Sequence, residues 1–265
     1  MNLALSIAKN DLMGSLARWS LIGILGWQDV KQRYRRSALG PFWLTISMGV
    51  MIGTIGLVFG HIFKAPMAEY LPFLAIGMIL WTFITSVTNE GCLGFVSAEG
   101  VIKQMPLPLA LHIARVVWRN IIILGHNLLI VPILFLLMGK TLTWSAIFVV
   151  PGSFVLIANV AWMALMLGVI CTRYRDMPQI VMSLIQVIYF LTPIIWMPAQ
   201  LSERASFFLL SLNPAYHTIE LVRAPLLGQL PSSENWIFSV VFCVTGWALT
   251  MLVFGKFKRR IAYWL

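Results

Sequence analysis

The chain has 265 residues, of which 60% are apolar (AVILMFWYC) and only 11% are charged, yet its formal net charge is +10. Soluble domains contain about 25% charged residues, and disordered chains are poor in apolar residues, so neither class fits. A nucleic-acid-binding surface is disfavoured, because the few charges would be spread over a mostly apolar surface. A basic, strongly apolar chain is typical of an α-helical membrane protein with basic cytosolic loops.

Residues 1–36 predict an amphipathic helix in the cytosolic membrane interface rather than a signal peptide. The apolar run Trp19–Trp27 is short, and no cleavage site of small residues follows it. Apolar residues recur at spacings of three and four, with Asp29 and Arg33 on the opposite side. The basic end suits anionic lipid headgroups. The alternative is a segment that only orients the first span. The residues expected at the interface or at a cytosolic gate are Trp27, Asp29, Arg33, Tyr34, Arg35 and Arg36.

A spanning helix needs about 20 mostly apolar residues, and six charge-poor runs meet this length. We therefore expect an all-α integral membrane protein whose domain 37–255 has transmembrane helices at about 37–63, 70–96, 115–139, 144–171, 177–197 and 235–255, followed by a basic cytosolic tail, 256–265. An even number of spans puts both termini on one side. That side receives 15 of the 19 Lys and Arg residues, so the positive-inside rule places both termini in the cytosol.

The loop 97–108 lies on the same side and is too apolar for an ordinary solvated loop. Its pattern predicts a short amphipathic helix that ends at two prolines. Its apolar residues favour a docking element for a soluble partner. Its docking residues are Glu99, Gly100, Val101, Ile102, Lys103, Gln104, Met105 and Pro106.

Charged residues cluster at the cytosolic boundary of the spans. They are Glu90, Arg115 and Arg119, together with Arg173, Arg175 and Asp176 of the second inner loop. One interpretation is a set of boundary charges and structural ion pairs. The other is a cytosolic gate whose ion pairs break and reform.

The segment 198–230 differs from a simple outer loop. Two apolar stretches, each too short to span, flank Asn213-Pro214. Irregular backbone at membrane depth is tolerated only where protein or water covers it. The segment therefore predicts two re-entrant helices, with a pair of helices on the outer surface as the alternative.

Polar side chains recur on one face of three spans. They are Trp43, Ser47, Thr54 and His61 in the first span, Trp81, Thr85 and Thr88 in the second, and Gln179, Gln186, Tyr189 and Trp196 in the fifth. Such faces point at protein or water rather than lipid. They either hydrogen-bond between helices or line a path. Hydroxyls, amides and aromatic faces suit sugars better than ions, because no ring of charges is present.

The chain has no recognisable machinery for chemistry or for an energy source. It contains no phosphate-binding loop, no HExxH motif and no Ser/His/Asp set, and its three cysteines show neither paired nor metal-binding spacing. We therefore expect no catalytic residue, cofactor or metal in this chain.

Five stretches resemble the permease subunits of bacterial ABC exporters of surface polysaccharide. The stretch Trp27–Trp43 is similar to the family's signature of an acidic residue, basic residues around a Tyr, and a Leu-Gly pair before a Trp, with Ala38 and Pro41 as departures. The others are the charged turn Arg173–Asp176, the Thr192-Pro193-Ile194 and Leu212-Asn213-Pro214 elements, and the ending Phe257–Ala262.

This resemblance implies a homodimer with two ATP-binding subunits in the bacterial inner membrane. ATP and Mg²⁺ would lie on the partner, the loop 97–108 would be the coupling helix, and a lipid-linked polysaccharide would pass through a channel. The segment 198–230 would form the outer gate, whose residues are Phe207, Phe208, Asn213, Pro214 and Tyr216. O-antigen is the expected cargo, with capsule or teichoic acid exporters in the same family.

Two alternatives remain open on the sequence. The first is an ABC export permease for a drug or a lipid. The second, from another class, is an integral-membrane enzyme acting on lipid-linked sugar, against which the missing catalytic carboxylates count.

Overall fold

The computed structural model describes residues 2–35, 40, 42–198 and 202–265, and every regular element in that part of the chain is a helix. The helices are α1 (Asn2–Leu16), α2 (Trp19–Tyr34), α3 (Phe42–Phe63), α4 (Met67–Cys92), η1 (Val96–Ala98), α5 (Glu99–Gln104), α6 (Ala110–Leu128), α7 (Ile130–Leu137), η2 (Trp144–Phe148), α8 (Val149–Arg173), α9 (Met177–Leu191), α10 (Glu203–Leu210), α11 (Pro214–Leu226) and α12 (Ser233–Trp264). The expected all-α membrane fold is confirmed.

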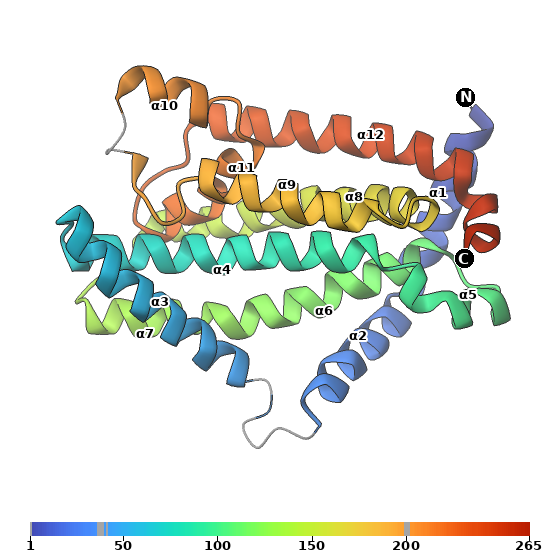
Figure 1. Ribbon diagram of the computed structural model, residues 1–265, viewed down its shortest axis with the longest axis horizontal. Coiled ribbons are helices and arrows are strands. Elements are labelled where there is room, and N and C mark those ends of the chain that lie inside the picture. Colours follow the sequence, from blue (N-terminus) through green and yellow to red (C-terminus); the bar gives the residue numbers. More distant parts are fainter. Residues whose placement is uncertain (1, 36–39, 41, 199–201) are drawn as a thin grey trace.

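The long helices run back and forth between two ends of an elongated bundle (Figure 1). We call the end that carries α1, α5 and the last turns of α12 the terminal end. The far end carries the α3–α4 turn and α10. Both chain termini lie at the terminal end, as an even number of crossings requires.

Five described segments are long and apolar enough to cross a membrane, namely Phe42–Phe63, Met67–Cys92, Ala110–Leu137, Trp144–Arg173 and Ser233–Trp264. A sixth apolar helix, α9, has only 15 residues and is therefore about 22 Å long at 1.5 Å per residue, shorter than the roughly 30 Å hydrocarbon core. It ends at Leu191 rather than at the expected residue 197. Thr192 is extended, as expected for a residue that precedes a proline.

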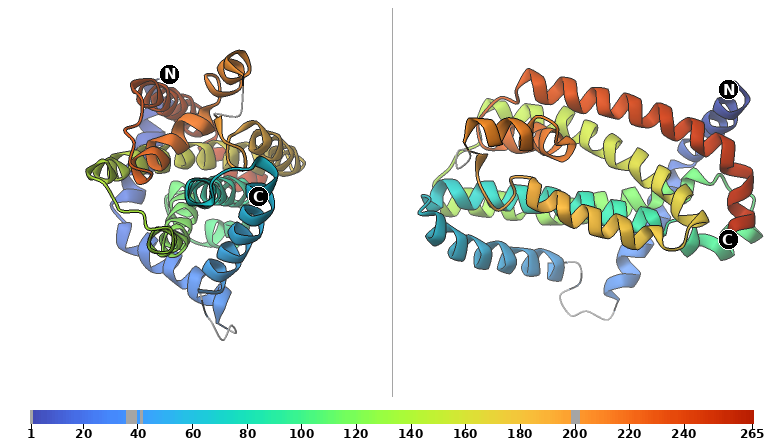
Figure 2. Two further views of the ribbon diagram at one scale, coloured as in Figure 1. Left: turned by 90° about the vertical axis from the view of Figure 1, so that its left-hand side faces the viewer. Right: turned by 45° about the horizontal axis from the view of Figure 1, so that its top comes forward.

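Helix α4 lies at the centre of the bundle. Its most apolar stretch is 83% buried, whereas that of α3 is only 11% buried within the chain. The run Tyr70–Trp81 is apolar on all sides, as a fully enclosed helix requires. Figure 2 shows α12 along the outside of the bundle, while α4 lies within it.

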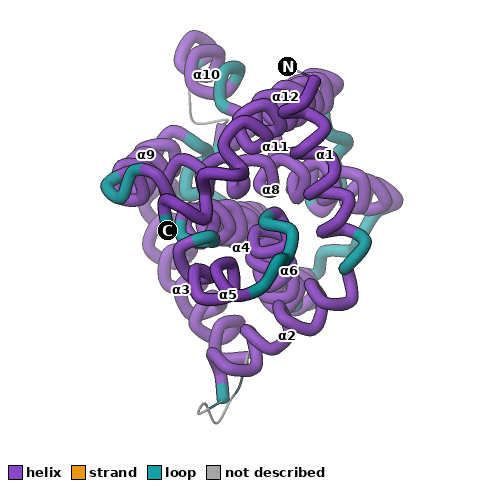
Figure 3. Tube along the Cα trace, turned by 90° about the vertical axis from the view of Figure 1, so that its right-hand side faces the viewer, coloured by secondary structure: helices purple, strands orange, loops and turns teal. Residues whose placement is uncertain are grey.

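Helices α3 and α9 flank α4 on one side of the molecule, and α6, α8 and α1 lie on the other (Figure 3). The outward faces of α3 and α9 are strongly apolar. Exposed examples are Val50, Leu57 and Ile62 on α3 and Ile180, Val187 and Phe190 on α9. These two helices therefore expose apolar surfaces that suit contact with lipid or with another apolar protein surface.

The ends of the chain differ from the expected layout. Residues 1–36 do not form one helix, because the chain breaks at Ala17 and Arg18 into α1 and α2. The inward stripe of α2 is Ile22, Gly26 and Val30, whereas its Trp19 and Trp27 are exposed. The tail 256–265 is not a separate segment either, because α12 continues to Trp264 and packs against α1 and α5.

The segment between α9 and α12 holds two short helices at the far end. Helix α10 stands out from the bundle (Figure 1), and its Phe207 and Phe208 are exposed. Helix α11 is embedded against α8, α12 and α4. A Cβ at Gly152 of α8 would collide with the backbone of Leu221, so glycine is needed for this close approach. Only α11 is thus covered by protein in the way that the re-entrant prediction requires.

Candidate functional site

A polar groove runs along α4 and α9 on the side that α3 flanks. Its cavity volume is about 890 Å³. The wall includes aromatic, hydroxyl and amide side chains, and its lining residues are Met51, Met78, Trp81, Thr82, Thr85, Asn89, Leu93, Arg175, Pro178, Gln179, Met182, Ser183, Ile185, Gln186 and Tyr189. Five residues expected on a path, Trp81, Thr85, Gln179, Gln186 and Tyr189, therefore share one groove.

The two helices run antiparallel along the groove, so its ends differ. Near the far end the ring centroids of Trp81 and Tyr189 are 5.6 Å apart. At the terminal end Asn89 of α4 and Leu93, which follows α4, lie in the same wall as Arg175, which precedes α9. Tyr189 lies 14 positions after Arg175, which corresponds to a groove about 20 Å long.

The polar residues of α3 lie outside this groove. Ser47, Thr54 and His61 are exposed, and each side chain contacts a carbonyl of its own helix. Trp43 is exposed as well. These residues share a helix face with Met51, the α3 residue that does line the groove. The lining expected from the first span is therefore incomplete in a single chain.

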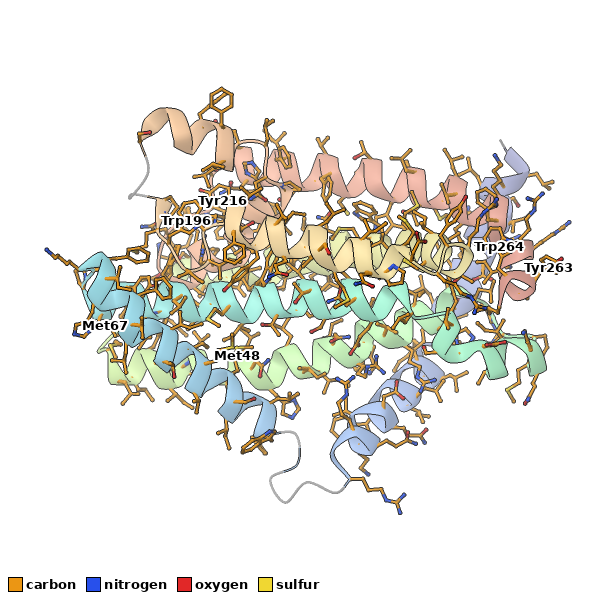
Figure 4. The ribbon with its side chains drawn as sticks, viewed as in Figure 1. Met48, Met67, Trp196, Tyr216, Tyr263 and Trp264 are labelled. Carbon is orange, nitrogen blue, oxygen red and sulfur yellow. The ribbon has the colours of Figure 1, made fainter. Side chains whose placement is uncertain are left out.

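Thr88 and Trp196 also lie outside the groove. Thr88 is buried, donates to the carbonyl of Ile84, and lines an apolar cavity behind α9. Trp196 lies at the far end together with Tyr216, opposite to Tyr263 and Trp264 (Figure 4). The Nε1 atom of Trp196 donates to the carbonyl of Phe190 at 3.2 Å.

At the terminal half of the bundle, a cluster of ion pairs joins α2 to α6. Nε of Arg115 donates to Oδ2 of Asp29 at 2.7 Å, and a second guanidinium nitrogen reaches the other carboxylate oxygen. Nη1 of Arg119 donates to Asp29 at 3.1 Å. The Asp29 side chain is 9% exposed, so this bidentate pairing compensates a nearly desolvated charge.

The same cluster extends to α4 through Arg119. Nη2 of Arg119 donates to Oε2 of Glu90 at 2.6 Å, and Nδ2 of Asn120 donates to the same oxygen at 2.6 Å. Arg33 of α2 donates to the other oxygen of Glu90 at 3.0 Å. Asp29 and Arg33, which the sequence places opposite the apolar stripe, thus tie α2 to the bundle. Glu90 pairs with Arg119 and Arg33 rather than with Arg115.

The remaining residues expected at the cytosolic gate do not join this cluster. Trp27 and Arg35 are exposed, while Arg36, the side chain of Tyr34, and the signature positions Ala38 and Pro41 lie outside the described residues. Arg173 stacks over the rings of Tyr174 and Trp264, each at 5.2 Å. Asp176 is exposed at the start of α9, and its side chain caps no backbone N–H.

The predicted docking loop forms the short helix α5 at the terminal end. Nζ of Lys103 lies 2.6 Å from Oε1 of Glu99, and this hydrogen bond is the main reason why the pKa of Glu99 lies below its usual value. Val101 and Met105 are 38% and 57% exposed, and Gly100, Gln104 and Pro106 are exposed as well. Ile102 instead packs against the core, so it belongs to the inward face of α5.

At the far end, two Pro-containing elements meet through one amide side chain. Nδ2 of Asn213 donates to Oγ1 of Thr192 at 2.9 Å. Oδ1 of Asn213 accepts from the backbone N–H groups of Ala215 and Tyr216 and so caps α11, while Pro214 occupies the first turn. The Thr192 and Asn213 elements, which lie 21 residues apart, thus form one joint beside the exposed Phe207 and Phe208.

Two buried charged residues, Asp11 and Arg223, are not among the candidate site residues that the sequence indicates. Asp11 of α1, whose side chain is 0% exposed, accepts from the backbone N–H groups of Leu109 and Ala110 at 3.1 and 2.8 Å and pairs with Lys258. Arg223, expected on the outer side, is 0% exposed. Its Nη1 donates to the carbonyl of Pro193 at 2.6 Å, and it pairs with Glu220. The Glu220–Arg223 pair has the helical spacing of three, whereas no local sequence pattern marks the contacts of Asp11 with α6 and Lys258 or of Arg223 with Pro193.

These features are those of a multi-pass helical membrane protein with a partly polar groove and an exposed short helix at one end, and they fit the class of membrane transport subunits. The sequence matches the ABC-2 type transporter family over residues 20–227. The chain belongs to that family.

Individual relatives agree with this assignment at low identity. The chain is 21% identical over 254 residues to the O-antigen export system permease protein RfbA of Klebsiella pneumoniae, which covers 92% of this chain and 94% of the relative. It is 21% identical over 228 residues to the protein of that name from Myxococcus xanthus, which covers 85% and 88%. The resemblance to ABC exporter permeases is thus confirmed, and the chain is a transport subunit.

Proposed function

We propose that this protein is the permease of an ATP-driven exporter that moves lipid-linked polysaccharide, with O-antigen as the cargo, across the bacterial inner membrane. The observation that carries the proposal is the groove along α4 and α9. Its aromatic pair, amides and hydroxyls match the C–H faces and hydroxyl groups of sugars. The names of the relatives from two organisms support the same cargo.

Two copies of the chain form the channel in this proposal. The groove is open on the side of α3, whose apolar stretch is only 11% buried, and α9 beside it is equally apolar outside. A second copy placed against α3 and α9 covers both surfaces. It also turns the stripe of Ser47, Thr54 and His61, which flanks Met51, into a continuation of the polar wall.

An ATP-binding partner supplies the energy, with ATP and Mg²⁺ bound on that partner. Helix α5 is the docking element, because it projects from the terminal end with Val101 and Met105 exposed. Membership of the ABC-2 type family supports this pairing. The terminal end then faces the cytosol, which agrees with the positive-inside rule.

The ion-pair cluster of Asp29, Glu90, Arg115 and Arg119 acts as the cytosolic gate. It joins the interfacial helix α2 to α6, which follows α5 in the chain, and to α4, which lines the groove. A movement of α5 therefore reaches all three helices. At the opposite end, the joint between Thr192 and Asn213, with Phe207, Phe208 and Tyr216 nearby, forms the outer gate.

Deletion of the gene in the host bacterium, followed by complementation, tests the proposal. Loss of surface polysaccharide together with retention of lipid-linked chains inside the cell is the expected result, because synthesis continues without export. Co-purification of an ATPase with the tagged protein is the second expected result. Normal surface glycan with no chains retained would overturn the assignment.

A further inference from the structure

Arg175 differs from the rest of the groove wall. The described lining of the groove otherwise consists of apolar, aromatic, hydroxyl and amide side chains, and Arg175 supplies its charge. It lies in the turn between α8 and α9, at the terminal end of the groove. A wall built for a neutral sugar chain has no need of a cation at one end, so this residue calls for a ligand of different chemistry.

The guanidinium of Arg175 forms no ion pair and no hydrogen bond with the described residues, although its charge acts on Glu99 through space. Arg115, Arg119 and Arg223 each pair with a carboxylate, whereas Arg175 has no carboxylate within 4 Å and donates no hydrogen bond to any described residue. Its five N–H donors are therefore available to a ligand. The neighbouring Asp176 is exposed and also forms no ion pair with the described residues.

Amide groups lie in the wall close to Arg175. Asn89 of α4 and Gln179 of α9 line the same end of the groove. The Oδ1 position of Asn89 is buried and has no hydrogen-bond partner among the described residues. Because the oxygen and nitrogen of an amide exchange places on a flip, this side chain can offer a donor or an acceptor to a bound group.

A planar guanidinium with free N–H groups matches the oxygens of a phosphate or diphosphate, which it binds through two parallel hydrogen bonds. The groove is therefore divided in chemistry. An anion-binding end lies at Arg175, and a neutral, aromatic end lies about 20 Å away at Trp81 and Tyr189. The division matches a cargo that carries an anionic ester at one end of a neutral chain.

We propose that Arg175, with Asn89 and Gln179, forms a subsite for the phosphate or diphosphate ester that joins the glycan to its lipid. This inference rests on the proposed function and names the part of the cargo that the terminal end of the groove binds. Arg175 also contributes, after Lys103, to the lowered pKa of Glu99 on α5. The subsite thus lies within electrostatic reach of the docking helix.

The test measures binding by the permease and its ATPase partner in nanodiscs of phosphatidylcholine, a lipid without net charge. The probes are a radiolabelled polyprenyl diphosphate, the neutral polyprenol of the same length, and free pyrophosphate as a competitor. R175Q is expected to weaken binding of the diphosphate lipid by about tenfold and to leave polyprenol binding unchanged. R175K keeps the charge but lacks the two parallel N–H donors of the guanidinium. Its affinity for the diphosphate lipid should therefore lie between those of the wild type and R175Q.

The matched control is R260Q, which removes an exposed cation near the end of α12, outside the groove. It should bind the diphosphate lipid like the wild type. The melting temperature of R175Q should stay close to that of the wild type, because Arg175 forms no hydrogen bond or ion pair with the described residues and its interaction with the exposed Glu99 is screened by solvent. Equal diphosphate binding by R175Q and wild type would overturn the subsite. Effective competition by micromolar free pyrophosphate would assign it to a soluble anion instead.

The two proposals fail separately. If deletion of the gene abolishes surface glycan but R175Q binds the diphosphate lipid normally, the export function holds and the subsite is wrong. If surface glycan is normal in the deletion strain, the export function is wrong whatever R175Q binds.

Discussion

The Oδ2 atom of Asp11 lies 2.7 Å from the Nζ atom of Lys258, which joins the first helix of the chain to the last. The same carboxylate accepts the backbone N–H groups of Leu109 and Ala110, so it also caps the start of α6. Three helices thus meet at one buried anion. The junction lies directly behind the loop that leads from α5 into α6, so it fixes the base of the proposed coupling element.

Replacing Asp11 with Ala is expected to destabilise the protein more than replacing it with Asn. Alanine leaves two N–H groups and a partly buried ammonium without a partner, at a cost of about 2–4 kcal/mol. Asparagine keeps one acceptor. The measurement is the melting temperature of the purified protein in detergent. D176N is the control, because Asp176 is exposed and forms no ion pair with the described residues. If D176N lowered the melting temperature as much as D11A does, the argument would be contradicted.

Charge on the outward face of α5 is expected to prevent binding of the ATPase without unfolding the permease. V101E and M105E place a carboxylate where apolar side chains are exposed, so each should abolish co-purification of the ATPase at an unchanged melting temperature. I102E enters the core contact instead and should lower the melting temperature. If V101E and M105E both retained the ATPase, α5 would not be the docking element.

Filling the groove is expected to block export while the complex stays intact. Ser183 lines the groove and is exposed to it, so S183W adds an indole to the cavity without disturbing the core. Surface glycan should fall by about tenfold or more, whereas association with the ATPase should not change. V244W adds the same bulk to the exposed face of α12 and serves as the control. Equal export by S183W and V244W would exclude this groove as the path.

Local sequence patterns indicate the helices of this fold better than the contacts between residues that are far apart in the chain. Long apolar runs identified the crossings, because the membrane requires a set length of apolar helix. The stripe of Gln179, Gln186 and Tyr189 was found because one helix carries all three. The pairing of Asp11 with the start of α6 joins residues 98 positions apart, and no period in the sequence reports such a contact. The break between α1 and α2 also lacks a proline to mark it.

The polar residues of α3 show a different limit. Their spacing placed Ser47, Thr54 and His61 on one face, and they are on one face, but the groove of a single chain reaches that helix only at Met51. A periodicity indicates which residues share a face and not which surface that face meets. For α3, the surface in question belongs to a second copy in our proposal.

Arg223 is expected to hold the far end of the bundle together. Its guanidinium lies 3.9 Å from the centroid of the Phe73 ring, donates to the Pro193 carbonyl at 2.6 Å, and pairs with Glu220. It thereby ties α11 to α4 and to the end of α9. R223A leaves Glu220 unpaired and opens a cavity against Phe73, at a cost of about 3–5 kcal/mol.

R223K separates charge from geometry at the same site. Lysine keeps the charge, but its single ammonium does not reproduce the planar contact with Phe73 and the separate bonds to Glu220 and Pro193. It should therefore recover only part of the melting temperature lost in R223A. The surface control is K64A, which removes an exposed cation at the far end. Full recovery by lysine would mean that charge alone, rather than the three-way contact, stabilises the joint between α4, α9 and α11.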